Sequence, residues 1–103
     1  MNKIMIDTSP IVLNQISNKL FCKSPLQIEI TVDKDAYILE EKTLPIDDVY
    51  LIELINSREQ LIEEVSGYIL WLWQEFIEVD EEKLSPGSKR LRQRLTNKFE
   101  VLA

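Results

Sequence analysis

The chain has 103 residues, with 12 basic and 18 acidic side chains, one cysteine and no histidine. One domain is expected at this length, and an apolar content of 45% is enough for one hydrophobic core. The lack of histidine excludes Ser/His/Asp triads, histidine bases and histidine-ligated metals, and a single cysteine excludes zinc sites that need two or more. The sequence therefore predicts a protein that is not an enzyme and holds no metal or cofactor.

The sequence shows no targeting segment. Residues 1–7 lack the apolar stretch of a secretory signal, and the longest uninterrupted apolar run, 68–73, is far shorter than the roughly 20 residues that span a bilayer. We therefore expect a cytoplasmic protein without a membrane contact.

The N-terminal part has the pattern of a helix. Residues 7–10 offer a hydroxyl cap followed by proline, and the apolar residues after them recur at helical spacing: Val12, Leu13, Ile16 and Leu20. This predicts a helix over 10–21, and the Ser24-Pro25 pair then breaks the chain.

Alternating residues follow. Over 27–32 apolar and polar side chains alternate strictly, a polar turn lies at 33–35, and 36–41 continues as a second strand, which predicts a β-hairpin. Residues 49–55 fit either a third strand or an extension of the next helix. We favour a strand, because Ser57 and Gln60 form a capping box that starts a new helix at 57.

The long helix predicted over 58–79 has a narrow apolar seam: Ile62, Val65, Ile69, Leu72, Phe76 and Val79. Such a seam packs on the sheet of an α+β domain or pairs in a coiled-coil dimer, and we favour the first. A last helix is expected over 89–100. The prediction is a single α+β domain over 1–103, with an N-terminal helix, a two- or three-stranded antiparallel sheet, a long amphipathic helix and a short basic C-terminal helix.

Charge is divided unevenly along the chain. Residues 1–83 carry seven basic and seventeen acidic side chains, a net charge of −10, whereas the tail 84–103 carries five basic and one acidic, a net charge of +4. The basic residues of the tail are Lys89, Arg90, Arg92, Arg94 and Lys98. They fit three roles, in this order of preference: neutralising the acidic end of the long helix within the chain or in a dimer, docking to an acidic protein, and contacting nucleic-acid phosphates.

Trp71 is the second candidate feature. Helical phase places it away from the apolar seam, on a polar face with Gln74, and Gly67 one turn earlier leaves flat backbone beside it and Tyr68. Either the tail covers Trp71 with an arginine stacked on the indole, which we favour, or Trp71 anchors a partner.

These features predict a non-enzymatic protein-protein interaction module, such as an adaptor, an assembly factor or a small regulatory subunit. The predicted partner-binding residues are Gly67, Tyr68, Trp71, Gln74, Arg90, Arg92, Arg94 and Lys98. A homodimer is expected, because a sheet of few strands leaves an open edge. The alternatives are an antitoxin-like regulator that binds nucleic acid through the tail, and an acidic inhibitor that mimics DNA.

Overall fold

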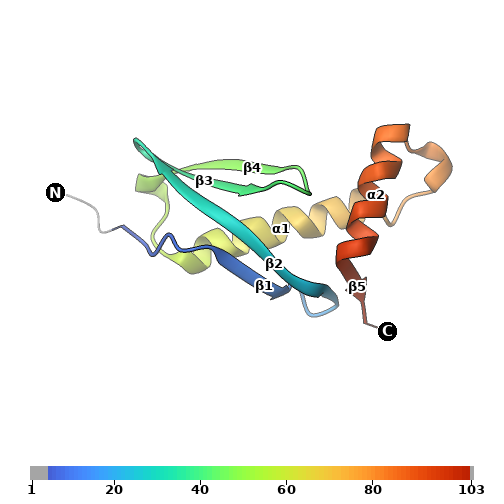
Figure 1. Cartoon of the computed structure of the whole chain (residues 1–103), viewed down its shortest axis with the longest axis horizontal. Helices are drawn as coiled ribbons and strands as arrows, with labels where there is room; N and C mark the ends of the chain where they lie inside the picture. Colours follow the sequence, from blue (N-terminus) through green and yellow to red (C-terminus); the bar gives the residue numbers. More distant parts are fainter. Residues whose placement is uncertain (1–4, 103) are drawn as a thin grey trace.

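A computed structural model describes residues 5–102. The fold is α+β, as predicted (Figure 1). The elements follow one another as β1 (Ile11–Gln15), β2 (Leu20–Asp33), β3 (Ala36–Glu41), β4 (Ile46–Leu51), the 3-10 turn η1 (Ile52–Leu54), α1 (Arg58–Phe76), η2 (Glu81–Lys83), α2 (Pro86–Lys98) and β5 (Phe99–Val101).

One antiparallel sheet of five strands carries the fold. Its strand order is β1-β2-β3-β4, and β5 pairs with the beginning of β2. Helix α1 runs along one face of the sheet, and α2 stands across the C-terminal end of α1 (Figure 1). The molecule measures 53 × 28 × 18 Å, and its radius of gyration of 15.1 Å exceeds the roughly 13 Å of a compact chain of this size. Helix α1 therefore covers one face of an elongated sheet, and no helix of residues 5–102 covers the opposite face.

The core lies between α1 and the inner face of the sheet. Helix α1 contributes five buried residues: Leu61, Val65, Ile69, Leu72 and Trp73. The predicted seam residues Ile62 and Phe76 are only half-buried, and α1 ends at Phe76 rather than Val79. Within residues 5–102, neither helix combines the length and the apolar character needed to cross a membrane.

The predicted N-terminal helix is wrong. Residues 11–15 form strand β1, in which Ile11 and Leu13 are buried and Val12 is 55% exposed. The Asp7 carboxylate, expected to lie near a helix cap, instead accepts a hydrogen bond from the Ser9 N–H (2.9 Å), which makes a turn. Arg58 at the start of α1 holds this segment by donating to three backbone carbonyls, those of Asp7, Ser9 and Pro10.

The predicted count of two or three strands is also wrong. Strand β2 does not begin after Pro25 but runs from Leu20 through it. The ladder with β1 jumps from the pair Leu13 and Leu26 to the pair Gln15 and Phe21, so Pro25 lies in an irregular stretch where no ladder hydrogen bond needs its missing N–H. The predicted last helix ends at Lys98, and the residues after it pair with β2 as β5.

The turn and cap predicted for the middle of the chain are present. Strands β2 and β3 form the hairpin around Lys34, which has a positive φ of 55°. The Ser57 hydroxyl accepts a hydrogen bond from the Gln60 N–H (3.2 Å), and the Gln60 side chain accepts one from the Asn56 N–H (2.9 Å). This capping box starts α1 at Arg58 and so fixes which residues face the sheet.

Candidate functional site

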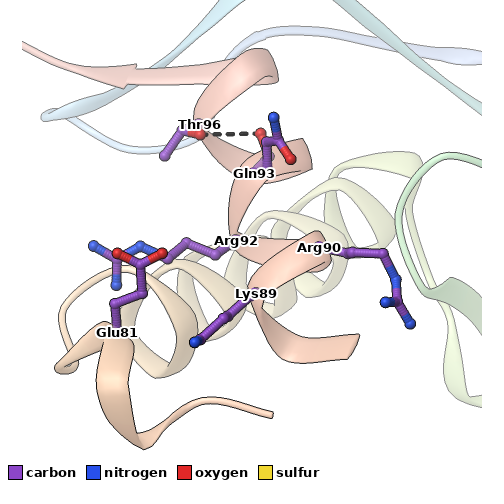
Figure 2. Close-up of a pocket in the computed structure, with 6 residues that line it drawn as sticks. All are labelled: Glu81, Lys89, Arg90, Arg92, Gln93 and Thr96. Atoms are coloured by element: carbon purple, nitrogen blue, oxygen red, sulfur yellow. Dashed lines mark hydrogen bonds between the residues drawn. The ribbon is translucent and has the colours of Figure 1, made fainter. Parts of the chain in front are cut away.

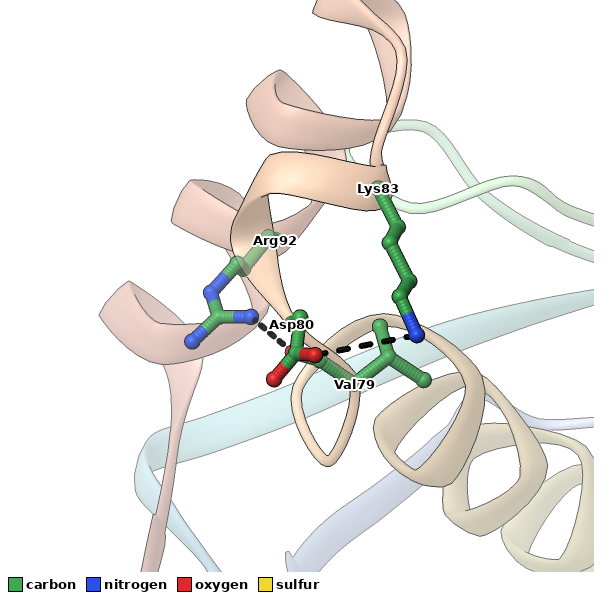
Figure 3. Close-up of polar contacts among 4 residues, drawn as sticks. All are labelled: Val79, Asp80, Lys83 and Arg92. Carbon is green, nitrogen blue, oxygen red and sulfur yellow. Dashed lines mark hydrogen bonds and ion pairs between the residues drawn. The ribbon is translucent and has the colours of Figure 1, made fainter.

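The basic helix α2 is bound to the end of α1 through Arg92. The half-buried Arg92 donates from Nη1 to the carbonyl oxygen of Val79 (2.9 Å), as Figure 3 shows. It also donates to the carbonyl oxygen of Phe76 (3.4 Å). These carbonyls lie at the negative end of the α1 macrodipole, where a cation is stabilising. Arg92 of the tail therefore does compensate the negative charge at the C-terminal end of α1, but it does so by binding backbone carbonyls. The nearby carboxylate of Asp80 pairs with the exposed Lys83 instead (3.7 Å).

A shallow groove of about 450 Å³ lies between α2 and η2. It is lined by Glu81, Lys89, Arg90, Arg92, Gln93 and Thr96 (Figure 2). In the figure, Arg90 points away from the side of the helix that bears Lys89 and Arg92. The groove is thus cationic but includes the Glu81 carboxylate, and Arg92 is already engaged at the end of α1.

The other predicted residues of α2 are accessible. Arg90 and Arg94 are exposed, and Lys98 is half-buried in the last turn. Within residues 5–102, no hydrogen bond, ion pair or ring contact joins the basic side chains of α2 to Trp71 or Tyr68. The predicted site therefore divides into two separate groups, one on each helix.

Trp71 is not covered by the tail. Its side chain is 49% exposed, and its ring stacks on Tyr68 with the centroids 5.9 Å apart and an interplanar angle of 18°. Tyr68 is held in turn by its hydroxyl, which donates to the carbonyl of Pro45 just before β4 (3.1 Å). The pair is therefore a rigid aromatic platform that faces solvent.

Gly67 lies one turn before Trp71 on the same exposed face. A Cβ atom placed on Gly67 meets nothing within 4 Å, so no contact of residues 5–102 requires glycine here. Glycine within a helix is nonetheless less favourable than alanine by about 1 kcal/mol.

The substitution Gly67→Ala is expected to stabilise the free protein. Since the added methyl group has open space, we expect the free energy of unfolding to rise by about 0.5–1 kcal/mol. Urea unfolding followed by circular dichroism measures this change. A fall in stability would show that Gly67 is needed by the fold itself.

Tyr50 on strand β4 and Tyr68 on α1 share Asp48 as a charged neighbour. The Tyr50 hydroxyl donates to the Asp48 carboxylate (3.4 Å), and burial raises the pKa of Tyr50 to about 12, with the charges of Asp48 and Glu64 acting in the same direction. Burial and Asp48 also raise the pKa of Tyr68. Both phenols are therefore protonated donors at neutral pH, in a negative environment.

On the opposite flank of α1, Gln74 borders an apolar cleft of about 380 Å³. Leu20, Leu70, Trp73 and Val101 supply its apolar walls, and polar residues of the β1–β2 loop form its rim. The exposed face of α1 thus runs from β4, over the aromatic pair and the flat backbone at Gly67, to this cleft.

We call the β4 side of this face the acidic aromatic surface and define it as Asp48, Tyr50, Glu64, Gly67, Tyr68 and Trp71. Glu64 and Gly67 are exposed, and Asp48 is half-buried. Among residues 5–102, the one ion pair within 4 Å joins Lys83 to Asp80, so no basic side chain of the described residues neutralises Asp48 or Glu64. The surface therefore combines aromatic area with unpaired negative charge.

Sequence reasoning found part of this surface. It placed Trp71, Tyr68, Gly67 and Gln74 on an accessible face of the helix, and it missed Asp48 and Tyr50, which β4 brings beside them. The signal for Tyr50 and Asp48 is the alternation through 46–51, which puts both on the sheet face that carries α1.

No family model matches this chain, and no curated protein or solved structure matches it at a significant level. Its function is therefore argued from the surface itself.

Proposed function

We propose that the chain is a protein-binding module, used as an adaptor, an assembly factor or a small regulatory subunit, and that its partner docks on the acidic aromatic surface. The observation that carries this proposal is the solvent-facing stack of Trp71 on Tyr68. Tryptophan and tyrosine dominate the binding energy of protein interfaces because they bury large areas at a small entropic cost.

The cost of Gly67 to the stability of α1 supports the same proposal. It weakens α1 and fills no steric need among the described residues, while it removes any side chain from the approach to Trp71. A partner backbone is able to come close to the helix at that position.

The charge of the surface sets the kind of partner. Asp48 and Glu64 lie beside the aromatic pair, and no basic side chain of residues 5–102 lies within ion-pair distance of either carboxylate. A lysine or arginine of a partner is attracted by both carboxylates and stacks on an indole face. We therefore assign a cationic protein segment to this surface.

The test is recovery of partners from a native lysate with three immobilised proteins: the wild type, Trp71→Ala and Val12→Ala. Val12 is the matched control because it is an exposed apolar residue of β1, away from α1. We expect Trp71→Ala to weaken binding of a basic partner by at least about thirtyfold, the effect of an interface hot spot. Val12→Ala should retain that partner, and added salt should weaken the complex.

Stability is measured in parallel, because Trp71→Ala also removes the stack on Tyr68, which contributes about 0.5–1.5 kcal/mol. A folded Trp71→Ala protein that recovers the same partners in the same amounts as the wild type would overturn the proposal.

Nucleic-acid binding through α2 has weaker support. The groove beside α2 contains the Glu81 carboxylate, Arg92 is bound to the end of α1, and the chain carries a net charge of −6. Nucleic-acid binders concentrate basic residues on an otherwise uncompensated face.

A further inference from the structure

Strand β4 has an open edge beside the acidic aromatic surface. It pairs with β3 on one side and ends the strand order of the described sheet on the other. The Ile52 N–H donates to the Asp35 carbonyl (2.8 Å) in continuation of the same register. Because hydrogen-bonded pairs alternate in an antiparallel ladder, Tyr50 and Asp48 bond to β3, whereas Asp47 and Val49 direct their backbone N–H and C=O groups away from it.

A row of carboxylates leads to this edge across the open face of the sheet. Glu29 pairs with Glu40 across β2 and β3, and Glu40 pairs with Asp47 across β3 and β4, so three carboxylates lie side by side on the outer face. Like charges directly opposite one another are destabilising. A strand added beside β4 would place one of its own residues next to Asp47 in this row. A cationic side chain at that position would face the Asp47 carboxylate.

Exposed apolar surface accompanies the charge. Val49 is 62% exposed on the outer face of the edge, and on the α1 side the Tyr68 hydroxyl reaches the Pro45 carbonyl at the start of β4 while its ring stacks on Trp71. An added strand would therefore meet apolar and acidic groups on both of its faces.

We infer that the partner segment binds in extended conformation, as an additional strand along the outer edge of β4, with lysine or arginine side chains on both of its faces. This inference rests on the proposed function and specifies the partner. Backbone hydrogen bonds to Asp47 and Val49 supply affinity, and side chains that alternate between the two faces supply specificity. Cations of the segment face Asp47 on the outer side and Asp48 and Glu64 on the inner side.

Charge favours this occupant over a second copy of the chain. Two β4 edges paired with each other would bring Asp47 and Asp48 of both copies into one interface, together with Glu64 of both α1 helices. These groups are all negative and have no ion-pair partner within the described residues. Such an arrangement is repulsive, whereas a cationic segment neutralises the same groups.

The experiment uses a synthetic peptide of about eight residues, a length that covers one strand, in which pairs of lysines alternate with pairs of valines, so that the extended peptide carries lysine on both faces. Its matched control has the same side chains and charge, but every backbone nitrogen is methylated, which removes the N–H donors on both edges. Binding to the full chain is followed by amide hydrogen exchange in nuclear magnetic resonance spectra. We expect the peptide to slow exchange at Asp47 and Val49 by about tenfold or more at saturation. The amides of Asp48 and Tyr50, already bonded to β3, should stay unchanged.

The methylated peptide should bind at least about tenfold more weakly, the effect of losing a few backbone hydrogen bonds. Equal binding of the two peptides, or protection confined to α1, would overturn strand addition and leave the protein-binding function standing. No binding at millimolar peptide would also overturn strand addition, while the Trp71→Ala lysate experiment decides the proposed function separately. Protection of Asp47 and Val49 in the free protein that disappears on dilution would show that a second copy is the occupant, which also overturns the inference.

Discussion

Phe99→Ala is expected to lower the free energy of unfolding by about 3–5 kcal/mol. Phe99 is 1% exposed in β5, where it pairs with Cys22 of β2, and Leu95 of α2 is buried in the same core. Removing the ring leaves a cavity that α2 and the sheet fill only in part. For a domain of this size the loss corresponds to a fall in Tm of at least about 12 °C.

Thermal unfolding followed by circular dichroism measures this loss. Val101→Ala is the matched control in the same strand, because Val101 is 51% exposed, and its substitution should change stability by less than about 0.5 kcal/mol. A cost below about 1 kcal/mol for Phe99→Ala would mean that the tail is detached in solution. If the expected loss is found, a protein that lacks 84–103 is an unsuitable binding control, because the deletion removes part of the core.

Arg92→Ala is expected to lower the free energy of unfolding by about 2 kcal/mol. Its guanidinium is half-buried and donates to the carbonyls of Val79 and Phe76, and the substitution leaves the end of α1 without this cation. Hydrogen bonds from a charged donor are worth about 1.5–3 kcal/mol, and the α1 dipole adds to the effect.

Arg94 supplies the control, since it is an arginine of the same helix with an exposed side chain. Urea unfolding of Arg94→Ala should give a free energy within about 0.5 kcal/mol of the wild type. Equal costs for the two substitutions would contradict a specific role for Arg92 at the end of α1. The difference in stability between the two variants also matters for binding studies. Variants that test nucleic-acid contact by removing basic residues of α2 should keep Arg92, because its loss would destabilise the fold.

The parts of the fold that depend on local chemistry were predictable from sequence. The Ser57 and Gln60 capping box, the alternation through the β2–β3 hairpin and the apolar seam of α1 each act over a few neighbouring residues. Helical phase alone predicted that Trp71 points away from the sheet, because its position lies well outside the seam.

The errors arose where distant residues decide the structure. Val12, Leu13, Ile16 and Leu20 satisfy helical spacing, but Ile11 and Leu13 pair with β2, and this pairing determines the conformation. Strand β5 has three residues, which are too few to show a recognisable strand pattern in the sequence. It forms because these residues pair with the beginning of β2. The expected cover of Trp71 failed for a related reason, since Arg92 anchors α2 at Val79, beyond the end of α1.

The acidic character of the acidic aromatic surface also depends in part on a contact between distant residues. Glu64 lies one turn before Tyr68 on the same helix, so helical spacing alone places it beside the aromatic pair. Nothing in the local sequence places Asp48 there, because β4 and α1 come together only through the core. The uneven charge of the chain, visible from the start, indicated an acidic body. Within residues 5–102, the fold brings no basic side chain within 4 Å of Asp48 or Glu64 beside the aromatic pair.

The acidic aromatic surface is tested most directly by measuring partner binding and stability together in Gly67→Ala. The account predicts opposite changes: the free energy of unfolding rises by about 0.5–1 kcal/mol, while recovery of the Trp71-dependent partner falls by about fivefold or more, because the methyl group stands where the partner backbone approaches. A Gly67→Ala protein that is more stable and binds the partner as well as the wild type would contradict it.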